Sequence, residues 1–186
     1  GPSRPLRVVA FDVDGTINVS GLATFDVGGN TLTLDPFDHD FGSIDVTAGT
    51  ATINELSATV IAAMSVTNTL TLNSGGGITD TGDISVTNLA TFNAGGGITL
   101  GDGTNANFGS VNLTGTTVQV NEQGATTING GAVSNTLTLT SGGAIDDNGG
   151  ITVNGLATFT AAGGTQSIVL NNTPNFGSLD LDGTTV

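Results

Sequence analysis

The feature that most constrains this chain is a sequence repeat with a constant spacing of 67 positions. The segment Ile17–Phe25 returns as Ile84–Phe92 and again as Ile151–Phe159, and both steps have this spacing (84 − 17 and 151 − 84). A second motif, Phe-Gly-Ser at 41–43, recurs at 108–110 and, after a one-residue insertion, at 176–178. A fixed period of this length indicates stacked repeats, so we expect each unit to bury its apolar side chains against its own copies.

Within each repeat the apolar residues alternate with polar ones, as in Leu32-Thr33-Leu34 and Val111-Asn112-Leu113. This period of two predicts short β-strands, and the Gly, Asn and Asp residues between them favour turns. Strands this short are stabilised best by stacking along an axis. We therefore predict an all-β fold, a right-handed parallel β-helix (β-solenoid) built from super-repeats of about 67 residues.

The similar triplets at Leu34, Ile53 and Leu72 are 19 positions apart, which predicts coils of unequal length if three of them make one repeat. With stacked strands about 4.8 Å apart, eight or nine coils form a rod of about 40 Å. We expect the recurring Phe25, Phe92 and Phe159 to be buried at equivalent places and to stack in ladders of inward-facing side chains.

The domain prediction follows the repeat. Residues 1–7 are a leading segment, which begins with a Gly-Pro typical of a cleaved tag, and residues 8–186 are one solenoid domain. Its repeats are placed at approximately 8–74, 75–141 and 142–186, the last one incomplete. We expect the strand at that incomplete end to expose unpaired backbone groups, which favours end-to-end self-association.

The charge balance excludes several classes of partner. The chain has a formal net charge of −14, and its only cations among Lys and Arg are Arg4 and Arg7. A phosphate backbone needs clustered basic side chains, so we expect no nucleic acid partner. No apolar run approaches the roughly 20 residues that span a bilayer, so we expect no membrane insertion.

Repeats with Leu-Ala-Thr-Phe, a Gly-rich turn, Phe-Gly-Ser and Leu-Thr-Leu resemble those of filamentous-haemagglutinin-like exoproteins and related autotransporter-like adhesins. The resemblance covers nearly the whole chain and implies an extracellular location on the bacterial cell surface. It also implies a non-catalytic role as a rigid stalk or adhesion surface in a large secreted protein, with an unknown surface or glycan ligand, or further coils of the same protein, as the partner. We predict no catalytic, cofactor-binding or metal-binding residues and no cofactor.

One segment suggests a further alternative. Residues 7–17 resemble the first motif of haloacid-dehalogenase-like phosphatases, which implies Asp12 as the nucleophile and Asp14 as the general acid/base with Mg²⁺. That chemistry needs a cation beside the transferring phosphoryl group, and no Lys or Arg follows Arg7. Within this segment, Ala10–Ile17 aligns with Ala144–Ile151, two periods later in the chain. We therefore interpret Asp12 and Asp14 as part of a turn between strands.

Two polar patterns also qualify as candidate sites. Asp35, Asp38 and Asp40 beside His39 are residue types that bind Ca²⁺, but we expect a solvated acidic turn with His39 at the surface. Thr-x-Thr pairs are typical of the outward ranks of ice-binding β-solenoids, although ordinary β-propensity also explains them. The pairs are Thr31/Thr33, Thr50/Thr52, Thr69/Thr71 and Thr136/Thr138.

Overall fold

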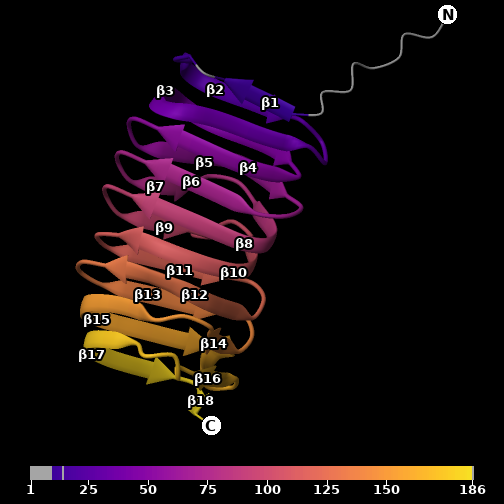
Figure 1. Ribbon diagram of the computed structural model, residues 1–186. Helices are drawn as coiled ribbons and strands as arrows, with labels where there is room; N and C mark the ends of the chain where they lie inside the picture. Colours follow the sequence, from indigo (N-terminus) through magenta and orange to yellow (C-terminus); the bar gives the residue numbers. More distant parts are fainter. Residues whose placement is uncertain (1–9, 14, 186) are drawn as a thin grey trace, which may run out of the picture.

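The computed structural model describes residues 10–13 and 15–185 and forms one stack of parallel coils (Figure 1). The chain advances from the first described coil, in indigo, to the last, in yellow, at the opposite end of the stack. The predicted fold class is confirmed: the protein is an all-β parallel β-solenoid of about eight turns. No helix in the described part of the chain is long and apolar enough to cross a membrane.

All the strands belong to one sheet, and one 3-10 helix, η1 (Ala162–Gly164), interrupts the last coils. The strands are β1 (Ala10–Val13), β2 (Asn18–Asp26), β3 (Thr31–Ala48), β4 (Thr50–Glu55), β5 (Thr59–Val66), β6 (Leu70–Ser74), β7 (Ile78–Asp80), β8 (Ile84–Ala94), β9 (Ile98–Leu100), β10 (Ala106–Gly115), β11 (Val118–Glu122), β12 (Thr126–Val133), β13 (Leu137–Ser141), β14 (Ile145–Asp147), β15 (Ile151–Ala161), β16 (Ser167–Val169), β17 (Asn175–Asp182) and β18 (Thr184–Thr185).

Each coil passes through three parallel ladders, which we call faces 1, 2 and 3. Starting from Phe92 on face 1, the chain passes Leu100 on face 2 and Ala106 on face 3, and returns to face 1 at Leu113. Face 1 stacks Leu34, Ile53, Leu72, Phe92 and Leu113. Face 2 stacks Leu100, Val120, Leu139, Phe159 and Leu181. Face 3 stacks Phe25, Val46, Met64, Ile84 and Ala106.

The coil is shorter than the sequence repeat suggested. The residues paired on face 1 are 19, 20 and 21 positions apart from Ile53 to Leu113. One turn therefore takes about 20 residues, which is at the short end of the range for solenoid repeats. The sequence period of 67 corresponds to about three and a third turns (67/20). Each repeat begins one face further round the solenoid than the repeat before it.

Because each repeat is shifted by one face, the expected stacking of Phe25, Phe92 and Phe159 in one ladder is wrong. Phe25, Phe92 and Phe159 lie on faces 3, 1 and 2, so they occupy equivalent local places but never stack on one another. Phe92 and Phe159 are fully buried, whereas Phe25 is only half-buried because it lies in the first described coils. Each ring packs edge-to-face on the phenylalanine of the following Phe-Gly-Ser motif, with ring centroids 5.6 to 5.7 Å apart.

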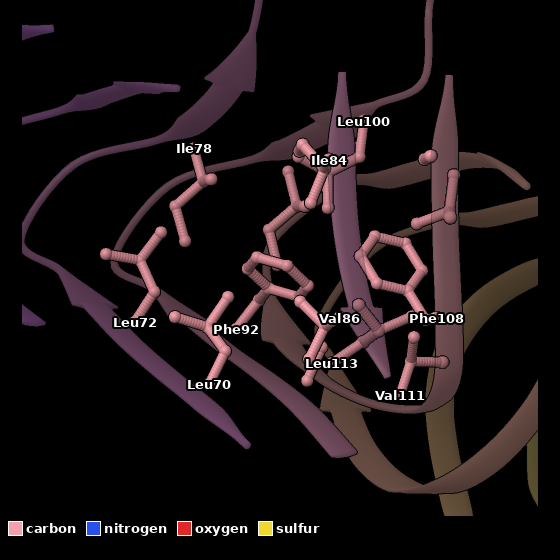
Figure 2. Close-up of a cluster of buried hydrophobic side chains, with 14 of the residues drawn as sticks. Leu70, Leu72, Ile78, Ile84, Val86, Phe92, Leu100, Phe108, Val111 and Leu113 are labelled. Carbon is pink, nitrogen blue, oxygen red and sulfur yellow. The ribbon is translucent and has the colours of Figure 1, made fainter. Parts of the chain in front are cut away.

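The interior is filled by apolar side chains from all three faces. Figure 2 shows the rings of Phe92 and Phe108 side by side, with Leu72 from face 1, Leu100 from face 2 and Ile84 from face 3 directed toward the same core. These five residues are at most 3% exposed. The side chains of all three faces therefore form one continuous apolar core.

The Phe-Gly-Ser motif requires glycine at its second position for a steric reason. A Cβ added to Gly42, Gly109 or Gly177 would lie 2.1 to 2.3 Å from a backbone oxygen of the preceding coil. The ladder also shifts register at this point, between Phe108 and Ser110. The motif therefore marks a bulge at which only glycine permits the close approach of two coils.

Candidate functional site

Asp12, in the phosphatase-like segment, does not lie in the predicted turn. Asp12 lies within strand β1, where it is paired with Thr33, because this segment forms the first strand of face 1. Asp14 lies outside the described residues, so the proposed catalytic pair is not placed by the structure.

The acidic segment around His39 is also not a turn, since residues 31–48 form the continuous strand β3. His39 is 0% exposed, so its expected surface position is wrong. It faces inward with Phe41, on which its ring stacks, and its Nδ1 accepts a hydrogen bond from the Ile17 N–H at 3.1 Å. Asp35 and Asp40 instead bind Asn54 and Ser57, and the side chain of Asp38 lies outside the described set. The described residues contain no group of three or more His, Cys, Asp or Glu side chains that could hold a metal ion.

The threonine pattern forms a regular rank on face 1. These threonines are partners in adjacent strands through four consecutive coils, and all are partly exposed: Thr33, Thr52, Thr71 and Thr91. The equivalent rank on face 2 is less regular because Gln119 stands between Thr99 and Thr138.

Beside this rank runs a ladder of amides. Asn93 donates from Nδ2 to Asn73 Oδ1 at 2.8 Å, Asn73 donates to Asn54 at 2.6 Å, and Asn54 donates to Asp35 at 2.8 Å. Each amide is fixed by its neighbour one coil away. We call this surface, with the rank of Thr33, Thr52, Thr71 and Thr91, the Thr/Asn face.

Two buried glutamates are the polar residues that sequence analysis missed. Glu55 is 0% and Glu122 is 4% exposed. Glu55 Oε1 accepts a hydrogen bond from the Phe41 N–H, and Glu122 Oε1 accepts one from the Phe108 N–H, both at 3.0 Å. They are the only glutamates of the chain and stand one full period apart (122 − 55 = 67), which is the signal that could have identified them.

Each glutamate accepts a backbone hydrogen bond at a place where the ladder of paired strands is interrupted. Strand β11 ends at Glu122, which pairs with Ala106, so no strand residue of the next coil lies opposite Phe108. The carboxylate takes the place of the missing carbonyl and satisfies an N–H that would otherwise be buried without a partner. Glu55 does the same at the end of β4, where it pairs with His39.

Burial is the main cause that raises the pKa of both carboxyl groups above the usual value for glutamate. The hydrogen bonds from Thr126 Oγ1, at 2.6 Å, and from the Phe108 N–H partly offset this effect for Glu122. The site of Glu55 is less well satisfied, because His39 Nε2 is buried beside it without a hydrogen-bond partner. Both glutamates therefore act as internal structural groups whose ionisation costs stability.

Taken together, the three ladders of one parallel sheet, the apolar interior and the outward polar ranks define a repeat protein of the parallel β-solenoid class. The chain belongs to the family of repeats of unknown function (DUF5649), whose model matches residues 10–48, 48–114 and 115–184. The matched segment 48–114 spans 67 positions (114 − 48 + 1), in agreement with the period read from the sequence. Neither the search of curated proteins nor that of solved structures found a match.

Proposed function

We propose that this chain is a non-catalytic structural module of a large secreted bacterial surface protein, where it acts as a rigid stalk that presents an adhesive face. The observation that carries the proposal is the stacking of all three faces along one axis within a single parallel sheet. About eight turns at roughly 4.8 Å each give a rod of about 38 Å. Apolar side chains occupy the interior of the described coils, so we place the binding surface on the exposed ladders.

The stalk role predicts that length depends on repeat number. Inserting a second copy of residues 48–114 after residue 114 preserves the phase of the repeat, and it should lengthen the rod by about 16 Å (3.35 turns at 4.8 Å). The cross-section should not change. Small-angle X-ray scattering of the parent and the extended protein measures both quantities. An extended protein that grows in width instead of length would contradict the proposal.

The adhesive role is assigned to the Thr/Asn face. Its strands β4 and β6 contain no charged residue except the buried Glu55, although the chain as a whole is strongly acidic, and the exposed carboxylate of the ladder is Asp35 at its N-terminal end. Threonine hydroxyls and amide groups both donate and accept hydrogen bonds, which suits a neutral partner rich in hydroxyl groups. A neutral glycan on a facing surface is such a partner.

Ice is the second candidate ligand, and the in-register rank of four threonines favours it.

Replacing Thr52 and Thr71 by lysine tests both candidates. It should abolish binding to immobilised neutral glycans while leaving the fold unchanged by circular dichroism, because both side chains point outward. Thr99→Lys with Thr138→Lys, on the less regular rank, is the matched control. Thermal hysteresis that is lost in the first pair, with no glycan binding by the parent protein, would replace adhesion with ice binding.

A further inference from the structure

The amide ladder of the Thr/Asn face has a fixed direction. Asn93 donates from Nδ2 to Asn73 Oδ1, and Asn73 donates in the same way to Asn54. Asn54 in turn donates to Asp35 Oδ1 at 2.8 Å. An ionised carboxylate only accepts hydrogen bonds, so Asn54 must turn its Nδ2 group toward Asp35. Each amide therefore turns its Nδ2 toward the preceding coil and its Oδ1 toward the next.

A second ladder shows what Asp35 contributes. Asn88 donates to Asn68 Oδ1, and Asn68 donates to Thr50 Oγ1 at 3.2 Å. A hydroxyl group both donates and accepts, so a ladder that ends on Thr50 can run in either direction. The ladder that ends on Asp35 can run in only one.

At its other end the ladder stops at Asn93. The strand partner of Asn93 in the next coil is Thr114, whose shorter side chain does not continue the ladder. Among the described residues, Asn93 Oδ1 accepts no hydrogen bond, whereas Asn73 Oδ1 accepts one at 2.8 Å. Hydrogen bonds in a chain polarise one another, and the negative charge of Asp35 polarises this chain in one direction. Asn93 Oδ1 is therefore a strengthened acceptor that the fold itself does not use.

A hollow of about 230 Å³ lies beside this end of the ladder, and the described residues that line it are all uncharged. Its lining includes Asn73, Asn93, Ala94, Thr114, Gly75 and Gly95. A Cβ at position 75 or 95 would lie 2.0 or 2.3 Å from a backbone oxygen of the preceding coil, so both positions require glycine. The hollow stays open because no side chain extends from these two positions.

The chemistry of the hollow matches one unit of a neutral glycan. Asn93 Oδ1 accepts a hydrogen bond and Thr114 Oγ1 both donates and accepts, so neighbouring hydroxyl groups of a sugar have complementary partners. Ala94 and the two glycines supply apolar surface for the C–H groups of the sugar ring. Pockets that enclose a drug-sized ligand measure roughly 300 to 1,000 Å³, so this smaller hollow holds a single sugar unit. The net charge of −14 disfavours an anionic sugar.

We propose that this hollow is the subsite for one neutral sugar unit, and that Asp35 is a positioning residue that directs Asn93 Oδ1 to accept a hydrogen bond from a sugar hydroxyl. The inference rests on the glycan-binding role proposed above and names the part of the face that selects the ligand. Asp35 acts from three coils away, about 14 Å at 4.8 Å per coil. At that distance salt screens its direct field, since the Debye length is about 8 Å at physiological ionic strength. Its effect on Asn93 therefore passes through the ladder.

Nuclear magnetic resonance titration of the nitrogen-15-labelled protein with methyl glycosides of the neutral hexoses tests the subsite. At least one glycoside should shift the resonances of the Asn93 side-chain amide and of Thr114. Thr114→Val and Asn93→Leu should each weaken its binding about five- to tenfold, because each removes a hydrogen bond to the ligand. Asn88→Leu, on the ladder that ends at Thr50, is the matched control and should bind like the parent. Failure of every glycoside to shift Asn93, or variants that bind as tightly as the parent, would overturn the subsite.

The positioning role of Asp35 has a readout that needs no ligand. In Asp35→Asn the end group both donates and accepts, so the ladder can reverse, and the side-chain amide resonances of Asn54, Asn73 and Asn93 should all shift or broaden. Asp45→Asn removes the same charge on face 3 and should leave them unchanged. A change confined to Asn54 would show that Asp35 does not set the direction of the ladder.

The outcomes separate this inference from the adhesive role. Immobilised glycans that bind the parent, fail to bind the variant with lysine at Thr52 and Thr71, and bind Asn93→Leu normally would support the adhesive face and overturn the hollow as its subsite. A parent protein that binds neither immobilised glycans nor glycosides would overturn both. The amide resonances still decide the role of Asp35 in that case.

Discussion

Replacing Phe92 or Phe159 by alanine should lower the free energy of unfolding by about 3 to 5 kcal/mol. Both rings are 0% exposed and are packed against a second phenylalanine, so the substitution leaves a cavity that a close-packed interior fills only in part. Phe25→Ala should cost clearly less, because that ring is half-buried. Urea denaturation monitored by circular dichroism, in dilute protein, measures all three.

Leu56→Ala is the control for this series, since Leu56 is 63% exposed and its truncation should have little effect. The comparison also tests how completely the first described coils are covered. Equal costs at Phe25, Phe92 and Phe159 would mean that the first described coil is covered as completely as the interior ones, contrary to the structure.

Glu122→Ala should be the most damaging change of a polar residue. It leaves the Phe108 N–H buried without an acceptor, which costs about 1 to 3 kcal/mol, and it also removes the partner of Thr126. Glu122→Gln should be tolerated, because the amide oxygen accepts from Phe108 and the amide nitrogen donates to Thr126. Thermal unfolding of the two variants at several pH values separates the lost hydrogen bond from the buried charge.

The direction of the pH effect follows from the raised pKa of Glu122. A group whose pKa is higher in the folded state than in the unfolded state stabilises the fold fully below the unfolded value, here about 4.5, and this contribution is lost as the pH rises through the folded pKa. The parent protein should therefore be less stable at pH 8 than near pH 5. Glu122→Gln should flatten this dependence and be more stable than the parent at pH 8, while Glu122→Ala should cost most near pH 5.

Asp83 gives a control of opposite sign. Its carboxylate is exposed, and hydrogen bonds from the Asn105 backbone N–H and side chain lower the pKa of Asp83 below its usual 3.8. The stability that the Asp83 carboxylate contributes is present above pH 3.8 and is lost as the pH falls through the folded pKa, so Asp83→Asn should not stabilise the protein at pH 8.

A Glu122→Gln variant with the same pH profile as the parent would contradict the prediction for Glu122. It would show that the Glu122 carboxyl group is neutral, or hydrated, throughout this range.

The architecture could be predicted from the repeat and its polarity pattern. The exact spacing at which Ile17–Phe25 returns, the alternation of apolar and polar residues and the Phe-Gly-Ser motif were sufficient to predict a parallel solenoid. They were sufficient because an inward side chain at every second position fits only a strand, and equal units bury their apolar sides most simply by stacking. The outward direction of Thr33 and Thr52 followed from the same alternation.

The relation between the repeat and the coil could be seen only in the folded stack. Sequence identity reports the period of the repeat, but the much shorter length of one turn is set by the strand pairings, as between Leu72 and Phe92, and these depend on turns and bulges that composition does not reveal. For that reason three similar phenylalanine motifs lie on three different faces. The spacing of Glu55 and Glu122 marks them as equivalent residues, but the burial of these two side chains and of His39 could not be predicted from the sequence. A polar side chain is buried here where the ladder leaves a backbone group without a partner, and such a gap exists only in the folded stack.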